Sequence, residues 1–445
     1  MLDTKKVGTT ICAFRKKAGH SQEKLAEMLH ISPQAISKWE NGHTLPETSL
    51  LPVLAQIFGC GIDDIIMPAY ASIEVDATKI QAEHIADYVV QKLDKLEKTK
   101  KPKLTDDVIA GAVAKAHNIF GDYTIQRGSQ SKSSGRTSTN ITVTAKDKEI
   151  KLLEVAYSGK GGEREFDNFV FLNEGHMQAI PNIYHADKDK KIILHEELSD
   201  GYIRGFDFDE DNENGAIIRA NYNSCLCAVA NYHKIFWENF GAFGRVGLPW
   251  HFEAKENVLA WIHDAMEKPF KKYRDDEKSG KIPKEWYGQN NAITDAQLDY
   301  FDEALKYLKS EYVKLIDTRF YAGKNITVIH GDLHPGQLAI SKDGKNVKFL
   351  DVKALRVGLC TEDLAMLIAL HLAPDAAALP LLGFYYDSLS EGAKDYSCDE
   401  FMSDYKLSVA ENMFFTIRLI NSGIFDYKMR NRAIRAFEFF VLGKK

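Results

Sequence analysis

The sequence predicts a multidomain protein in which an all-α bundle is followed by a larger, two-lobed α+β unit. The chain has 445 residues, which is more than one hydrophobic core ordinarily serves. Residues 4–67 place apolar side chains at helical spacing, whereas strand-like alternation begins only at Tyr123. After Leu198 the pattern becomes mainly helical again. We therefore expect a sheet lobe and a helical lobe with a cleft between them.

Composition narrows the class of protein. The sequence contains no uncharged apolar run of about 18 residues and no N-terminal secretion segment, so we expect a cytoplasmic protein without a membrane partner. The six cysteines are scattered and lack the paired spacing of a zinc site, which predicts reduced thiols. The net charge of -6 means that any contact with nucleic acid must come from a local surface.

We divide the chain by pattern into four segments. Residues 1–70 form the helical bundle, and residues 71–120 are a polar helical connector whose apolar stripe could also serve as a dimer contact. Residues 121–200 form the sheet lobe and residues 201–445 the helical lobe. The stripe of the connector consists of Ile85, Val89, Leu93 and Leu96.

Alternation predicts the strands of the sheet lobe, and a loop rich in serine, glycine and lysine is expected at Ser129–Ser138. The expected strands are Tyr123–Gly128, Thr139–Ala145, Glu149–Tyr157 and the apolar Lys191–Leu198. Helical spacing returns in the second lobe, and the expected helices are Ile217–Phe240, Glu256–Tyr273 and Ala296–Leu315.

The segment Ser21–Gly42 has the parts of two short helices held across a tight turn. Ser21 and Ser32 are suitable N-caps, and Ala26 is small enough to let the helices cross closely. Inward-facing positions are occupied by Ile31, Ile36 and Trp39, which leaves the outer face to Pro33, Gln34, Ala35 and Lys38. Gln suits adenine, Lys suits guanine or phosphate, and Ala suits a thymine methyl group.

This segment closely resembles the XRE family of helix-turn-helix proteins, the Cro and phage-repressor type. The likeness implies binding to double-stranded DNA, with Gln22 and Asn41 on phosphates and with Gln34 and Lys38 on bases. Because a single copy should bind weakly, we also expect a homodimer on a two-fold operator, with half-sites about one helical turn apart. A bundle that mediates only protein contacts is the alternative. The residues expected at the DNA are Gln22, Ser32, Pro33, Gln34, Ala35, Lys38 and Asn41.

A second motif, His330–Gln337, reads His-Gly-Asp-Leu-His-Pro-Gly-Gln and follows an apolar strand. Asp332 lies in this loop, and Asp351 ends the next strand after a turn at Asp343-Gly344. That turn should bring the two carboxylates to one cleft. Phosphoryl transfer needs such a pair, one acid to accept a hydroxyl proton and one to hold magnesium.

The motif, the later Leu350-Asp351 and the still later Glu362-Asp363 resemble the aminoglycoside phosphotransferase and choline kinase family from about Tyr123 onward. The likeness implies a protein-kinase-like fold that uses ATP and Mg²⁺. It makes Asp332 the catalytic base, Asp351 and Gln337 the metal ligands and Asp363 a buried anchor of the loop. It also implies that adenine lies at the hinge Ile192–Gly201, and the residues expected around the nucleotide are Glu165, Glu196, Leu198, His334 and Gln337.

Two departures from the family pattern bear on activity. Gln337 stands where the family has asparagine, which strains metal geometry. Glu154 stands at the position of the phosphate-orienting lysine, where it should meet Glu165 and disfavour ATP. A shift of register that turns Lys151 inward, or a cation from Lys132 or Arg136, would compensate, although we expect Lys132 and Arg136 to lie in a solvated loop.

The sequence leaves three functions open, of which the third is phosphorylation of a partner protein. The first is a transcriptional regulator whose kinase-like domain binds a nucleotide or a small hydroxylated ligand. The second is an active, ATP-dependent small-molecule phosphotransferase with an attached DNA-binding domain that regulates its own gene. Fold analogy does not choose between them.

Overall fold

The computed structural model describes residues 4–47, 50–60, 65, 103–119, 121–133, 135–146, 148–175, 177–204, 220–282, 293–424 and 426–444. The chain divides into two compact units, Met1–Lys101 and Pro102–Lys445. The stripe of Ile85, Val89, Leu93 and Leu96 predicted in the connector lies outside the described residues.

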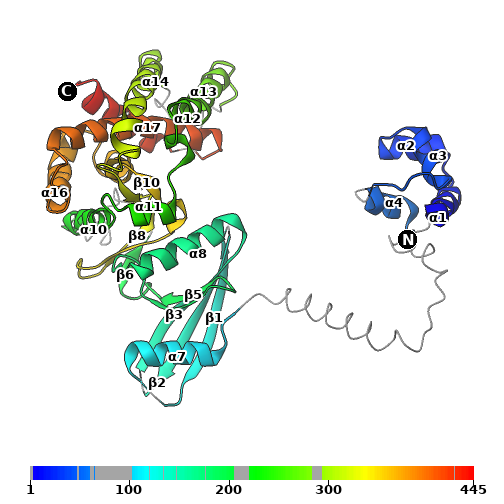
Figure 1. Cartoon of the computed structure of the whole chain (residues 1–445), viewed down its shortest axis with the longest axis horizontal. Coiled ribbons are helices and arrows are strands. Elements are labelled where there is room, and N and C mark those ends of the chain that lie inside the picture. Colours follow the sequence, from blue (N-terminus) through cyan, green and yellow to red (C-terminus); the bar gives the residue numbers. More distant parts are fainter. Residues whose placement is uncertain are drawn as a thin grey trace. The chain divides into compact units, whose positions relative to one another are not determined.

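The first unit is helical where it is described (Figure 1). Ser21 and Ser32 are N-caps as predicted, because their hydroxyl oxygens accept the backbone N–H groups of Lys24 at 3.1 Å and Ala35 at 3.3 Å. Proline occupies the first position of α3, where its fixed φ angle suits the helix. The N–H that proline lacks would have no partner within the helix at this position. The helices are α1 (Thr4–Lys17), α2 (Gln22–Leu29), α3 (Pro33–Glu40) and α4 (Leu51–Phe58).

Side chains from all four helices form one small core. Ile36 and Trp39 point inward as predicted, and Ile31 is half-buried beside them. A close approach between two helices lies at Gly8 on α1. A Cβ added there would lie 2.1 Å from the carbonyl oxygen of Trp39, so only glycine allows α1 to pack this closely against α3.

The sheet lobe of the second unit is a five-stranded antiparallel sheet in the order β1-β2-β3-β5-β4 (Figure 1). The helices α7 (Asp106–His117) and α8 (Gly159–Glu174) cover its opposite faces. Residues 106–117, which the sequence placed in the connector, therefore pack against the sheet. The strands are β1 (Thr124–Ser133), β2 (Arg136–Ala145), β3 (Lys148–Tyr157), β4 (Ile183–Asp187) and β5 (Ile192–Glu196).

The prediction of a loop at Ser129–Ser138 is wrong. β1 and β2 stay paired to Ser133 opposite Arg136, with a register shift between Arg127 and Gln130. The described residues between 129 and 138 are exposed or half-buried, so they lack the apolar alternation that reveals a strand in a sequence. Backbone pairing maintains the hairpin there instead, and Gly135 turns it at φ +75°.

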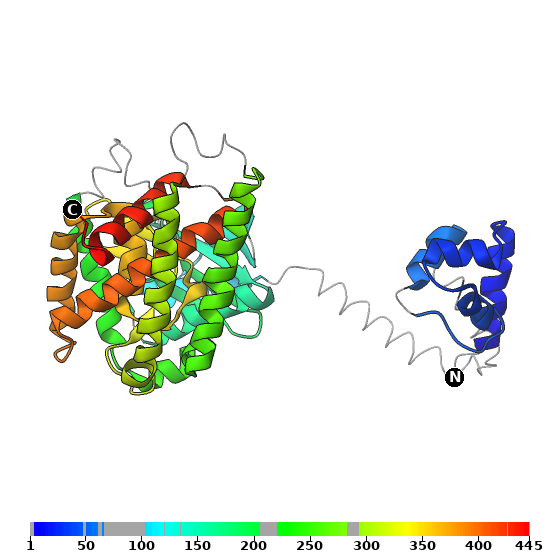
Figure 2. The same ribbon diagram turned by 90° about the horizontal axis from the view of Figure 1, so that it is seen from above.

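The helical lobe confirms the three predicted helical stretches in its described parts. The long helix α17 (Cys398–Asn421) contacts α13, α14 and α18 (Figure 2). The other α-helices are α10 (Tyr222–Ile235), α11 (Phe240–Val246), α12 (Lys255–Ile262), α13 (Lys268–Lys278), α14 (Asp295–Leu315), α15 (Cys360–Leu364), α16 (Leu379–Ser390) and α18 (Tyr427–Ala436).

Two small sheets carry the loops of this lobe. One pairs β7 with β10, and the other has the order β6-β8-β9. The predicted turn at Asp343-Gly344 joins β8 to β9, with Gly344 at φ +72°. The strands are β6 (Tyr202–Arg204), β7 (Thr327–Ile329), β8 (Leu338–Ser341), β9 (Val347–Phe349) and β10 (Arg356–Gly358).

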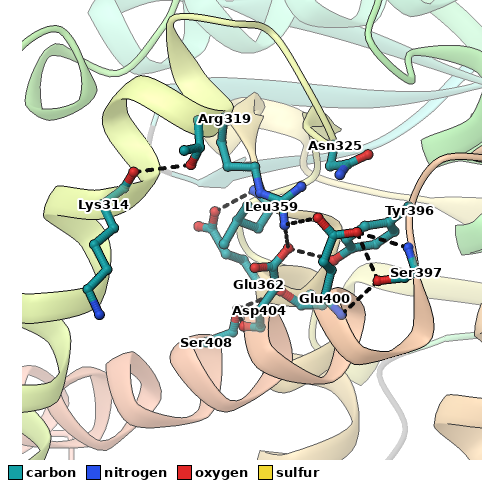
Figure 3. Close-up of polar contacts among 12 residues, drawn as sticks. Lys314, Arg319, Asn325, Leu359, Glu362, Tyr396, Ser397, Glu400, Asp404 and Ser408 are labelled. Atoms are coloured by element: carbon teal, nitrogen blue, oxygen red, sulfur yellow. Dashed lines mark hydrogen bonds and ion pairs between the residues drawn. The ribbon is translucent and has the colours of Figure 1, made fainter.

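A largely buried polar cluster ties the helical turn Ile316–Phe320, which follows α14, to the start of α17 (Figure 3). The guanidinium of Arg319 lies 3.6 Å from the carboxylate of Asp404 and 3.4 Å from that of Glu400. The hydroxyl of Tyr396 donates to Asp404 at 2.7 Å. Burial raises the pKa of Asp404 to about 6 despite the nearby Arg319.

Candidate functional site

The outer side of α3 is the first candidate surface. Ser32, Pro33, Gln34 and Lys38 are exposed there, while Ala35 is half-buried at the edge of the core. Gln34 and Lys38 are four residues apart, which places them on one face of the helix. This face therefore offers an amide and a cation with no core function.

Gln22 and Asn41, the predicted phosphate contacts, both lie close to α3. The side-chain nitrogen of Gln22 donates to the carboxylate of Glu40 at 2.8 Å. Arg15 binds the same carboxylate at 2.6 and 2.9 Å. Although burial acts to raise the pKa of Glu40, the hydrogen bonds from Arg15 and Gln22 lower it overall. Asn41 is exposed and donates to Ser37 at 3.3 Å.

In the second unit, the loop after β7 is held by Asp363, the predicted buried anchor. Its carboxylate accepts the backbone N–H groups of His330 and Gly331, both at 2.8 Å, and lies 3.1 Å from Nε2 of the buried His233. Burial acts to raise the pKa of Asp363, but the bonds from His233 and from the loop lower it overall. His334 also supports the loop, since its Nδ1 accepts from the N–H of Gly336 at 3.2 Å.

Asp332 is half-buried in this loop. Its pKa is raised, primarily by burial and also by the negative charge of Asp351, against the lowering effect of His334. A carboxylate in such a place is a better proton acceptor than one in water, which suits a general base.

Asp351 follows Leu350 after the end of β9 and lies in the left-handed backbone region at φ +51°. One of its carboxylate oxygens, Oδ2, is 3.0 Å from both Arg136 and Lys353. The other, Oδ1, is buried and has no hydrogen-bond partner among the described residues. Burial acts to raise the pKa of Asp351, but Lys353 and Arg136 lower it overall, so the group is anionic at neutral pH.

The prediction that Arg136 lies in a solvated loop is wrong. Its Nη1 donates to Glu165 of α8 at 2.8 Å, and its Nη2 donates to Asp351 at 3.0 Å. One cation on β2 therefore joins the helix of the sheet lobe to the acid of the helical lobe. Lys132, in contrast, is exposed as expected.

The predicted encounter of Glu154 with Glu165 is wrong. Glu154 is buried on the face of β3 that packs under α7, where it accepts the backbone N–H of Leu104 at 2.9 Å and lies 3.3 Å from Arg127. The alternate residues Leu153 and Val155 face the cleft instead. Lys151 is paired with Asp200 and lies partly exposed. The cleft therefore contains no like-charge contact from Glu154.

A cavity of about 230 Å³ opens beside these residues. It reaches from the predicted hinge, through Glu196 and Leu198, to Arg136 and Asp351. Glu196 binds Asn182 and lies 3.3 Å from the buried Lys348, which also holds the backbone oxygens of Gln178 and Ile180. The hinge end of the cavity is thus fixed by a buried cation that sequence inspection did not single out.

The oxygen donors around Asp351 suit magnesium, which prefers carboxylate and amide ligands. Gln337 is near Asp351 in the fold, since its backbone oxygen accepts the N–H of Leu350 at 2.9 Å. Where the structure is described, no group of three or more histidine, cysteine or acidic side chains is arranged to hold a metal.

The structure brings together Asp332, Asp351 and Glu165, and it adds residues that sequence reasoning missed. Arg136 was named only as one of several alternatives, and Lys348 and His233 were not assigned a role at the site. These three residues stand out only because their polar side chains are buried or paired within strands and helices, and burial cannot be read from a single sequence. The described residues include no helix long and apolar enough to cross a membrane.

Comparison with known proteins supports the helix-turn-helix that the sequence predicts in the first unit. Residues 13–65 match the family model described as helix-turn-helix, HTH_3. Over 63 residues the chain is 33% identical to the competence pilus inhibition repressor of Acinetobacter baylyi, an alignment that covers 14% of this chain and 57% of that protein. The chain thus spans a little more than half of this relative. The N-terminal unit contains a helix-turn-helix domain of the XRE type.

Solved structures similar to the chain are kinases of small molecules. A choline kinase of Streptococcus pneumoniae is 14% identical, with a TM-score of 0.38, over 76% of this chain and 99% of that chain. An ethanolamine kinase of Plasmodium vivax is 13% identical, with a TM-score of 0.41, over 79% and 93%. The kinase-like fold of the second unit follows from the order of its own elements, a five-stranded antiparallel sheet with α8 after β3 and a helical lobe that carries the β7 loop and the β8–β9 hairpin.

Proposed function

We propose that this protein is a sequence-specific DNA-binding transcriptional regulator whose kinase-like unit binds a nucleotide or a small hydroxylated ligand. The observation that carries the proposal is the outer face of α3, where Gln34 and Lys38 are exposed on a helix fixed by the Ser32 cap and a buried core. The match to a helix-turn-helix family model and the similarity to a repressor support it.

We propose that Gln34, Lys38, Ala35, Pro33 and Ser32 face the major groove and that Gln22 and Asn41 bind flanking phosphates. One small helical unit offers few contacts, so a cytoplasmic homodimer on a two-fold operator, with half-sites about one helical turn apart, is the expected assembly. A protected footprint with a single, unrepeated half-site would contradict the dimer.

The test of DNA binding begins by selecting bound sequences from a random pool with the full-length protein. Gln34→Ala should relax the preference at one base pair and lower affinity about 5- to 100-fold, the range of a bidentate base contact. Gln56→Ala is the matched control, because Gln56 is an exposed glutamine on α4, outside the helix-turn-helix segment. Equal affinities of both variants for the selected site would reject the assignment of Gln34.

For the second unit, the cavity between the hinge and Asp351 supports nucleotide binding with Mg²⁺. Asp351 and Gln337 would hold the metal, which neutralises phosphate charge when bound. Calorimetric titration with ATP, with and without magnesium, tests this. Magnesium-dependent binding that Asp351→Ala abolishes would support a nucleotide site, whereas absence of binding in both conditions would restrict the cavity to other ligands.

A specific observation favours phosphotransferase activity as a second function. Asp332 is half-buried, close enough to Asp351 for their charges to interact, and has a raised pKa. It would accept the proton of an acceptor hydroxyl. Asp332→Ala should then abolish transfer while operator binding stays intact, and equal transfer by variant and parent would exclude this role.

A further inference from the structure

Arg136 occupies an unusual place for a residue in a polar hairpin. It lies at the start of β2, next to the turn at Gly135, and 27% of its side chain is exposed. Its guanidinium nevertheless reaches two buried acids, Glu165 on α8 and Asp351 after β9. The backbone oxygen of Gly135 accepts from Ser158 at 2.9 Å, which holds the tip of the hairpin over the start of α8.

The other cations around the cleft are placed for different tasks. Lys151 pairs with Asp200, and Arg127 binds Glu154 and the backbone of Leu104 on the opposite face of the sheet. Lys353 contacts Asp351 but is 51% exposed. Among the described residues that line the cavity, the cations are Arg136 and Arg204, and of these two Arg136 is the one that contacts Asp351.

We propose that Arg136 binds the phosphates of the nucleotide in this cleft, in the role that a cation on β3 would otherwise fill. The inference rests on the nucleotide binding proposed above. Glu165 orients the guanidinium through Nη1, and Nη2 is the donor that passes from Asp351 to a phosphate oxygen when the nucleotide is bound. That exchange leaves Oδ2 of Asp351 with Lys353 alone, beside Oδ1, which has no partner among the described residues and suits a cation.

The chemistry of the side chain fits this role. A guanidinium is planar, carries five N–H donors and stays charged at every physiological pH, so it can keep one carboxylate while it binds a phosphate. Burial of Glu165, which is 2% exposed, makes loss of the cation costly, because this acid would then lose its ion-pair partner. The alternative role is a purely structural ion pair between the lobes.

The two roles predict different results when the phosphate number of the ligand is varied. We would titrate the full-length protein with adenosine, ADP and ATP, each with magnesium, by calorimetry. If Arg136 binds phosphate, Arg136→Ala lowers affinity for ADP and ATP about 10- to 100-fold, as expected for a lost charge-assisted hydrogen bond, and changes adenosine affinity less than about 2-fold. Arg136→Lys should keep most of the ATP affinity.

Lys132→Ala is the matched control, because it removes one exposed cation from the same hairpin. It should leave all three affinities unchanged. Equal ATP affinity of Arg136→Ala and the parent would overturn the proposal, and so would a uniform loss of all three ligands, which indicates a structural role. A parent protein that binds none of the three would reject nucleotide binding itself, a result distinct from binding that ignores Arg136.

Discussion

Glu165 shows how the environment of one residue sets its chemistry. Its carboxylate is almost fully buried between Arg136 and the cleft. Burial raises its pKa to about 7, against the lowering effect of Arg136 and with a further raising effect of Asp351. Near neutral pH this acid is therefore partly protonated, and its ionisation couples to stability.

The first prediction concerns the pH dependence of stability. Because the folded pKa of about 7 exceeds the unfolded value of about 4.3, the folded state binds the extra proton, and stability falls as pH rises between these values. Glu165→Gln should remove on the order of 3 kcal/mol of this loss across the interval, as measured by urea unfolding from pH 4.5 to pH 8. Identical slopes for variant and parent would refute the shifted pKa.

The second prediction concerns the cap of the DNA-binding helix. Ser32→Ala should lower the free energy of unfolding of the first unit by about 1 kcal/mol, since the N–H of Ala35 loses its acceptor. Ser32→Asp should retain the stability because aspartate is an equally good cap. Chemical unfolding followed by the fluorescence of Trp39 in a variant with the other tryptophans replaced would measure both. A stable alanine variant would show that the cap is dispensable.

Single residues also mark where sequence-based prediction succeeds and where it stops. Asp332, Asp351 and Asp363 were found because a motif of several fixed positions surrounds them. Arg136 was underestimated because its partners, Glu165 and Asp351, are 29 and 215 residues away in the chain. Local composition does not reveal an ion pair between residues so far apart in the sequence, and only the three-dimensional structure shows it.

At the scale of elements, successive side chains of β3 point to opposite faces of the sheet, one of which lines the cavity while the other packs under α7. Leu153 and Val155 line the cavity, whereas Glu154 between them faces α7 and holds the backbone at Leu104. Alternation predicted this strand correctly, but it could not reveal which of the two faces lines the cleft. Both faces of β3 are covered, so the burial pattern of the strand does not alternate cleanly between a wet and a dry side.

The third prediction tests this element. Glu154→Ala should destabilise the second unit by about 2 kcal/mol, because a buried hydrogen bond to Leu104 and a charge partner of Arg127 are lost. Asp106→Ala is the control, since its carboxylate binds the same arginine but is 67% exposed and should contribute less than about 1 kcal/mol. Equal effects of the two substitutions in urea unfolding would contradict the buried role of Glu154.

The whole molecule consists of two compact units with separate cores. Each unit buries its own apolar side chains, so each should unfold cooperatively by itself. The helix-turn-helix and the kinase-like architecture were both predictable, because each leaves a motif of many fixed positions in the sequence.

The fourth prediction follows from this division. Scanning calorimetry of the full chain should show two transitions, and ATP with magnesium should raise the midpoint of the larger one by an amount that grows with ligand concentration. Operator DNA should raise the smaller one. A single transition that both ligands move together would show that the units are thermodynamically one body.

Regulation by a ligand requires that binding to the second unit change the affinity of the first unit for its operator. A ligand changes operator affinity only if it binds two conformations of the protein with different affinities. We expect operator affinity to change when the nucleotide site is filled, measured by titration of labelled operator with and without ATP. Unchanged affinity across all nucleotides would remove coupling from the proposal and leave two independent activities.

The close approach at Gly8 offers a substitution that should disturb the first unit without disturbing the second. Gly8→Ala would place a methyl group 2.1 Å from the carbonyl oxygen of Trp39, so α3 must shift or the small unit must loosen. The second unit has its own core and should be untouched. If the first unit binds DNA as proposed, we expect a cell carrying this allele to keep the second unit and to lose occupancy of the operator, and comparison with an Arg136→Ala allele would assign each cellular effect to one unit of the protein.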